Sequence, residues 1–463
     1  MNGRSGVWWA VLGVAWLLAS APWAAALEPM RVNDDWMAKV EAELTASAEL
    51  RLSQDFSAGG TEQPYTKRKG GYFESLIRLG SELYREDESV KFRVEFDFFG
   101  LGDPGNGDLA GFFDGLSTHG YDGDISLEEA WVQFGVSEGN WTRLGIQRFR
   151  SDHAGLIYND SDRGAVYHGT LGEVGFNLAY FAKSFDDAVS QLNTENGRPW
   201  HVMIANLEVP VGTVQVIPSF HFSIDRTGPT ETNVGYVGAS AAGQVSVFQV
   251  LTAYYWAFGE QTGGMVNPAD QTVDAHLLLI NVALPLMEGK VIPSTGFIFA
   301  SGDDDPLDRR ARGFDAIYDY IEAWGFNDYF IRPRKNLGPA TLCRAHSGLF
   351  TMRDFDEPAN FINPGIAAFN LGLTTKWTDE FTTDLNAGPV YLPQTDTPEL
   401  VLGRGVGHEL AYRMNANATW QLNETATLKG GVAACVPENG AQAIFGGNNN
   451  TAWDFVLMLV IKV

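Results

Sequence analysis

Residues Val90–Phe98 read V-K-F-R-V-E-F-D-F, and this alternation is the strongest structural signal in the chain. Side chains at every second position of a strand share one face. One face of this stretch is therefore apolar and the other is charged, the charged side chains being those of Lys91, Arg93, Glu95 and Asp97. If such strands recur along an exported chain, they are typical of a wall between lipid and water.

The N-terminus predicts an export signal. Arg4 is the only charged residue before Glu28, residues 7–19 are apolar, and Ala24, Ala25 and Ala26 form a small-residue cleavage site. We therefore expect residues 1–26 to be a cleaved signal peptide and residues 27–463 to form a single domain. No later apolar run reaches the roughly 18 residues that a transmembrane helix needs.

Further alternating segments follow along the chain, joined by connections that alternate between short and long. Short ones such as Ser137–Asn140 and Pro210–Gly212 are rich in the residues of tight turns, whereas Gly100–Ser126, Arg150–Asp162 and Gly302–Pro364 are long. This pattern predicts an all-β fold, a transmembrane antiparallel β-barrel of eighteen strands with long extracellular loops and short periplasmic turns. The count is sixteen if the two weakest segments, Arg163–Gly169 and Trp200–Val209, are loops.

The alternative all-β fold is a large soluble protein such as a propeller, but propellers carry repeats of fixed period and none is visible. The formal net charge of −25 argues against nucleic acid as a partner. The two cysteines, Cys343 and Cys435, are too few for a disulfide scaffold and are predicted on the same side of the membrane. They form either one disulfide or two thiols.

The polar face of each predicted strand supplies candidate pore-lining residues. These are Glu74, Arg78, Glu82, Lys91, Arg93, Glu95, Asp97, Glu129, Trp131, Gln133, Arg143, Gln147, Lys183, Glu409 and Arg413. One interpretation is a lining that selects solutes by charge. The other is that these charges pair across strands and only hydrate the wall.

Two charged loops allow more than one interpretation. Arg148, Arg150, Asp152 and Arg163 form either a constriction, if their loop folds inward, or a solvated loop. The long loop at about 302–364 is predicted to be extracellular or to plug the barrel. Its Asp303, Asp304, Asp305 and Asp308 supply carboxylates for a calcium ion, or else make an acidic surface without a metal. No other cofactor is expected.

Three stretches resemble the alginate-export-like outer-membrane porins. They are Ser126–Phe134 with Arg143–Arg150, Ala300–Asp308 with Gly313-Phe314-Asp315, and Leu402–Tyr412. The resemblance implies an eighteen-stranded, monomeric barrel through which a solute diffuses. The chain departs from the family at Gly145-Ile146-Gln147, where the family pattern is G-R-Q, and its predicted lumen is mixed in sign rather than strongly basic.

The sequence therefore predicts a porin or channel, not an enzyme, in the outer membrane of a Gram-negative bacterium. The solute is a small polar molecule or an oligo- or polysaccharide. Expected partners are outer-membrane lipid, lipopolysaccharide and the barrel assembly machinery. A barrel that sheathes a secretion or electron-transfer partner is the alternative, followed by an outer-membrane hydrolase, for which neither H-E-x-x-H nor G-x-S-x-G is present.

Overall fold

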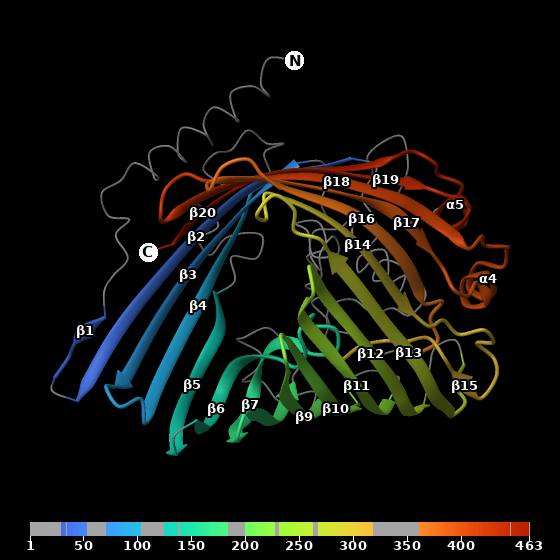
Figure 1. The fold of residues 1–463 in the computed structure, drawn as a ribbon. Coiled ribbons are helices and arrows are strands. Elements are labelled where there is room, and N and C mark those ends of the chain that lie inside the picture. The colour runs from blue at the N-terminus through green and yellow to red at the C-terminus, as the bar shows by residue number, and fades with distance from the viewer. Residues whose placement is uncertain are drawn as a thin grey trace.

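The chain forms a closed antiparallel β-barrel (Figure 1). The computed structural model describes residues 29–33, 35–52, 71–102, 125–137, 139–183, 200–226, 231–262, 267–317, 361–444 and 446–462. Within them the wall consists of Trp36–Leu52 (β2), Gly71–Arg85 (β3), Val90–Gly102 (β4), Ile125–Ser137 (β5), Asn140–Arg150 (β6), Asn159–Leu171 (β7), Val174–Lys183 (β8), Trp200–Val211 (β9), Val214–Asp225 (β10), Glu231–Val245 (β11), Phe248–Thr262 (β12), Gln271–Ala283 (β13), Val291–Ala300 (β14), Ile366–Lys376 (β16), Phe381–Tyr391 (β17), Glu409–Gln421 (β18), Ala426–Pro437 (β19) and Ala452–Lys462 (β20).

The eighteen wall strands pair each with the next, and the barrel closes because the first pairs with the last. In that seam Leu44 of β2 lies opposite Ile461 of β20. Within the described residues, every strand of the wall therefore has a paired strand on both sides, as a barrel in lipid requires. The prediction of an eighteen-stranded barrel is confirmed, and the two weakest predicted segments are the strands β7 and β9.

Four short elements lie outside the wall. Met30–Arg31 (β1) pairs with the start of β2, and Arg310–Ala311 (β15) runs parallel to the start of β13. The helices Asp396–Leu402 (α4) and Asn439–Ile444 (α5) occupy two of the long connections. Figure 1 shows α4, α5 and β15 at the end of the barrel opposite β1. Among the described residues, no helix is long and apolar enough to cross a membrane.

The outer surface of the wall is apolar and carries aromatic side chains near both ends. Phe92, Phe134 and Trp420 are exposed close to the short turns. Tyr180, Tyr412 and Trp453 are exposed close to the long loops. Two aromatic girdles flanking an apolar band are characteristic of barrels that sit in a membrane.

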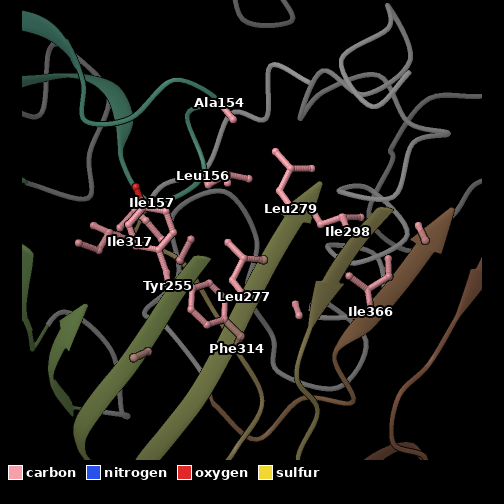
Figure 2. Packing of buried hydrophobic residues seen from close by; sticks show 14 of the residues in the cluster. Ala154, Leu156, Ile157, Tyr255, Leu277, Leu279, Ile298, Phe314, Ile317 and Ile366 are labelled. Atoms are coloured by element: carbon pink, nitrogen blue, oxygen red, sulfur yellow. The ribbon is translucent and has the colours of Figure 1, made fainter. Parts of the chain in front are cut away.

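The buried hydrophobic residues lie inside the barrel, not between separate layers (Figure 2). Leu156, Ile157 and Tyr158 come from the connection between β6 and β7, and Phe314 and Ile317 come from the connection after β14. They pack against inward-facing wall residues such as Tyr255 and Leu277. The long connections therefore fill part of the barrel interior on the side of β7–β14.

Three expectations fall on the termini and the loops. The predicted signal peptide, residues 1–26, and the terminal Val463 lie outside the described residues. Of the loop predicted at Gly302–Pro364, the structure describes residues 302–317 and 361–364. The predicted loop Arg150–Asp162 is shorter in the structure, because β7 already begins at Asn159.

Candidate functional site: the inner wall and the inward loops

Strand β4 presents two different faces. Phe92 is 42% exposed on the outside, whereas Asp97 is 1% exposed on the inside. Val94 and Phe96 share the outer face with Phe92, and Glu95 is buried like Asp97. The alternation seen in the sequence thus separates an apolar outer surface from a charged inner one.

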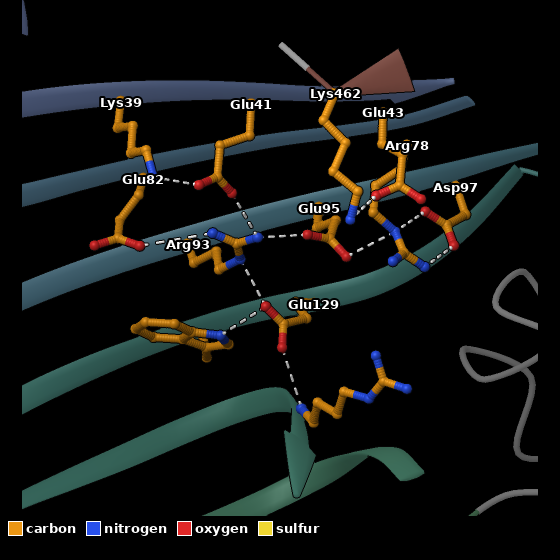
Figure 3. A network of polar contacts seen from close by, with 12 residues as sticks. Lys39, Glu41, Glu43, Arg78, Glu82, Arg93, Glu95, Asp97, Glu129 and Lys462 are labelled. Carbon is orange, nitrogen blue, oxygen red and sulfur yellow. Dashed lines mark hydrogen bonds and ion pairs between the residues drawn. The ribbon is translucent and has the colours of Figure 1, made fainter. Parts of the chain in front are cut away.

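Arg93 lies at the centre of a network of carboxylates on the inner wall (Figure 3). Its guanidinium lies 2.7 Å from Glu129 of β5, 3.0 Å from Glu41 of β2 and 3.6 Å from Glu82 of β3. It also donates a hydrogen bond to Glu95 of the same strand, at 2.5 Å. One arginine therefore joins four neighbouring strands.

A second arginine extends the network toward the long-loop ends of the strands. Arg78 of β3 makes a bidentate contact with Asp97, at 2.7 and 2.6 Å, and lies 3.1 Å from Glu95. Asp97 is directly opposite Arg78 in the pairing of β3 with β4, which aligns the two side chains. Lys39 pairs with Glu41, and Lys462 of β20 lies 3.0 Å from Glu43.

Arg143 of β6 is placed differently, because aromatic rings and an amide surround it. Its guanidinium carbon lies 4.0 Å from the ring centre of Trp131 and 4.9 Å from that of Trp141. It donates to Oε1 of Gln133 at 3.2 and 2.9 Å. This geometry combines cation–π contact with hydrogen bonding. Gln147, on the same face, is buried and donates to the carbonyl of Gly164 at 3.2 Å.

A row of amides lines the inner face of β16, β17 and β18. Asn370 donates to Asn386 at 3.1 Å, and Asn386 donates to Asn415 at 3.2 Å. Arg413 is buried at the end of this row and donates to Asn370 at 3.1 Å. Glu409, predicted beside Arg413, is exposed at the start of β18. This part of the wall is therefore polar but carries few charges.

The connection between β6 and β7 folds into the barrel, and its residues 151–158 are held by Asp152. The Asp152 carboxylate accepts hydrogen bonds from the amides of Ala154 at 2.9 Å, Leu156 at 3.0 Å and Ile157 at 3.2 Å. Burial raises the pKa of Asp152, and these amide hydrogen bonds oppose that rise. The side chain organises the loop from within.

His153 ties the same loop to strands across the interior. Its amide donates to Ser240 of β11 at 3.1 Å, and its ring lies 3.1 Å from the carbonyl of Gln215 in β10. Burial lowers the pKa of His153, against a smaller opposing effect of the Gln215 carbonyl. Since Gln215 is the second residue of β10, the loop reaches toward the short-turn end of that strand.

A second inward segment follows β14. The hydroxyl of Tyr236 donates to the carbonyl of Asp315 at 3.0 Å, and the amide of Phe361 donates to Gln261 of β12 at 2.8 Å. The ring of Tyr236 contacts Phe314 edge-on, at 6.0 Å between centroids. Residues 301–317 and 361–365 therefore lie along the inner face of β11–β13.

The aspartates of this segment surround an arginine. Arg312 pairs with Asp304, lies 3.2 Å from Asp308 and has its amide 3.4 Å from Asp303. Asp305 is exposed and accepts from the amide of Leu307. Burial raises the pKa of Asp303 to about 7. In the described residues no group of three or more His, Cys, Asp or Glu side chains is arranged to hold a metal ion, so the calcium site stays a prediction.

The structure does not bring the predicted constriction residues together. Only Asp152 belongs to the inward loop; Arg148 and Arg150 are exposed on β6, on the face of the exposed Leu144. Arg163 is exposed on β7, opposite Ile146 in the pairing, and so shares that outer face. These arginines lie outside the inward loop because the strands continue to Arg150 and resume at Asn159, which fixes the side of the wall on which each arginine lies.

Other predicted residues are only partly described. Lys91 lies 3.1 Å from Glu88 of the adjacent turn. Glu74 and Lys183 belong to β3 and β8, but their side chains lie outside the described part of the structure. Cys435 is buried on β19, and Cys343 lies outside the described residues, so their pairing stays a prediction.

The sequence interpretation missed the contribution of β2. Lys39, Glu41 and Glu43 enter the network from a strand in which charged and apolar residues alternate as clearly as in β4. The same period-two signal could have found them. The amide row was also missed, because single asparagines in separate strands give no local signal.

Comparison with solved structures places this barrel among outer-membrane porin folds. The outer membrane protein OpdK of Pseudomonas aeruginosa, in a structure with vanillate, matches with a TM-score of 0.53 and 10% identity over 92% of this chain and 98% of that one. OccK11 (OpdR) of the same organism matches with a TM-score of 0.52 and 10% identity, over 92% and 96%. A BenF-like porin from Pseudomonas fluorescens gives 0.51 and 9%, over 92% and 98%.

At such low identity the likeness is one of fold. No family model matches the chain, and neither does any curated protein sequence. The resemblance to the alginate-export-like porins therefore stays a prediction, while the eighteen-stranded porin fold is shown.

Proposed function

We propose that the chain is an outer-membrane channel that lets a small polar solute diffuse passively across the outer membrane of a Gram-negative cell. The observation that carries this proposal is the closed barrel with an apolar, aromatic-girdled outer face and a charged inner wall. Such a wall is stable in lipid only as a closed barrel, and its interior suits water and polar solutes. The fold of the solved porins supports the same function.

The inward loops bear on the size of the solute. Residues 151–158 and 301–317 occupy space inside the barrel, which narrows the path on the side of β7–β14. A narrowed path favours a channel for small solutes over a barrel that encloses a protein partner. It also gives the channel a place where size and charge act together.

We also propose which kind of solute passes through the channel. OpdK was solved with vanillate, but that ligand belongs to that protein. A polyuronate such as alginate would be drawn by a basic interior, whereas Arg93 and Arg78 here are matched by carboxylates. We therefore favour a small polar solute over alginate.

Lipid, lipopolysaccharide and the barrel assembly machinery are the proposed partners of the chain. The proposed oligomeric state is a monomer.

Planar-bilayer recording tests the channel function. Purified protein, refolded in detergent and added to a bilayer in KCl, is expected to give discrete conductance steps. The same preparation after heat denaturation is the control and is expected to give none. If a sample that is folded by heat-modified gel mobility gives no steps, the channel proposal fails.

A further inference from the structure

The network around Arg93 carries more acidic than basic groups. Its carboxylates are Glu41, Glu43, Glu82, Glu95, Asp97 and Glu129. Its basic groups are Lys39, Arg78, Arg93 and Lys462. Six carboxylates against four cations leave an excess of two negative charges on this part of the inner wall.

The neighbouring basic side chains do not remove this excess. Lys91 pairs with Glu88 of the adjacent turn, which adds one charge of each sign. Arg143 contributes one positive charge beside Trp131. Elsewhere on the inner face, Glu208 and Asp384 accept hydrogen bonds from Asn177 and Thr374 and add two negative charges, whereas Arg413 beside Asn370 adds one positive charge.

We propose that this wall makes the channel prefer cations, and that Arg93 sets how strong the preference is. The inference rests on the proposed channel function and names the class of solute: small inorganic or organic cations rather than anions. Charges on a pore wall enrich the mobile ions of opposite sign within about a Debye length, roughly 10 Å at 0.1 M salt.

Arg93 has this role because it lies among four carboxylates. Its single charge offsets part of the field of Glu41, Glu82, Glu95 and Glu129 at one position on the wall. Replacing Arg93 by a neutral residue leaves all four carboxylates in place and deepens the negative potential there. Replacing Glu41 and Glu129 by Gln has the opposite effect.

The reversal potential in a KCl gradient across a planar bilayer tests the proposal. The reversal potential of the unmodified channel is expected to have the sign that a K⁺-preferring pore gives. R93Q is expected to raise the K⁺ to Cl⁻ permeability ratio roughly twofold, the effect on both ions of one unit charge about 8 Å away in water that is screened by about 0.1 M salt. The double variant E41Q/E129Q is expected to lower the ratio.

Arg148→Gln is the matched control, because it removes the same charge from the exposed outer face of β6, two strands along the wall from β4. Its permeability ratio is expected to stay that of the unmodified channel. Clear steps with a Cl⁻-preferring reversal potential would overturn the inference and leave the channel function standing. A complete lack of steps would overturn the channel function itself. If R93Q does not fold, the unmodified channel and E41Q/E129Q still decide.

Discussion

Tyr236 of the barrel wall donates its hydroxyl hydrogen to the backbone carbonyl of Asp315, 79 positions further along the chain, at 3.0 Å. The tyrosine is fully buried and its ring also contacts Phe314 and Phe361. One wall residue thus holds both ends of the second inward segment, on either side of the residues that the structure leaves undescribed.

Removing the hydroxyl in Y236F is expected to loosen residues 313–317 without unfolding the barrel. Loss of one hydrogen bond costs about 1 kcal/mol, which corresponds to about fivefold faster local opening. Hydrogen exchange measured by mass spectrometry on the peptide that spans these residues gives the change. Tyr254→Phe is the control, because that hydroxyl contacts His276 on the exposed outer face. Equal exchange in Y236F and the unmodified protein would contradict the anchoring role.

Asp152→Ala is expected to disorder the loop of residues 151–158. The substitution leaves the buried amides of Ala154, Leu156 and Ile157 without their acceptor. An unsatisfied buried amide costs about 1–3 kcal/mol, so the expected loss of local stability is about 3 kcal/mol or more. Asp152→Asn keeps one acceptor oxygen, so its loop is expected to be less stable than that of the unmodified protein and more stable than that of Asp152→Ala. Hydrogen exchange of the amides at 154–157 ranks the three proteins. If these amides exchange equally fast in Asp152→Ala and the unmodified protein, Asp152 does not hold the loop.

The inward segment that contains Asp303 is expected to depend on pH. Burial raises the pKa of Asp303 from 3.8 to about 7, so the folded segment binds this proton more tightly than the unfolded chain. The segment is therefore most stable below about pH 4, loses stability as the pH rises to about 7, and changes no further above that. Hydrogen exchange of residues 301–317 at pH 5 and pH 8, corrected for intrinsic rates, measures the difference.

Asp303→Asn is expected to abolish this pH dependence, because the amide has the shape of the carboxyl but does not titrate. Asp305→Asn, which changes an exposed carboxylate two positions away, is expected to keep it. A pH dependence that survives in Asp303→Asn would assign the titration to another group.

The sequence predicts the wall of this protein better than it predicts the interior. Alternation in stretches such as Val90–Phe98 predicts both the strand and the side on which each residue lies, because a strand in a membrane wall contacts lipid on one side and water on the other. The weak segments β7 and β9 carry less of this signal. In β9, Pro210 and the buried Asn206 replace the clean apolar and polar alternation.

The interior depends on contacts that no local pattern encodes. His153 contacts Ser240 and Gln215, which are 87 and 62 positions away. Arg93 of β4 contacts Glu41 of β2 across the intervening strand β3. Charge composition alone could not tell whether Arg148 and Arg150 point into the barrel. The exact end of β6 and the start of β7 decide that, and such boundaries are weakly specified by sequence.

Gly145 is expected to be essential for assembly of the wall. Its φ of +128° is unfavourable for any residue with a side chain, and a Cβ there would lie 2.1 Å from the carbonyl oxygen of Ala130 and 2.8 Å from the Cα of Trp131, both on β5. Both neighbours are backbone in a paired strand, so neither can move aside. Gly145→Ala is therefore expected to destabilise the folded barrel by more than about 3 kcal/mol.

Gly172→Ala is the matched control for this substitution. Its φ of +65° lies in the left-handed region, but no atom lies within 4 Å of the added Cβ. Its expected cost is the backbone term alone, about 1–2 kcal/mol. Urea titration of the folded fraction, read by heat-modified gel mobility, compares the two variants. Equal midpoints would show that the approach of β6 to Ala130 relaxes at little cost, and Gly145 would then be a conformational rather than a packing requirement.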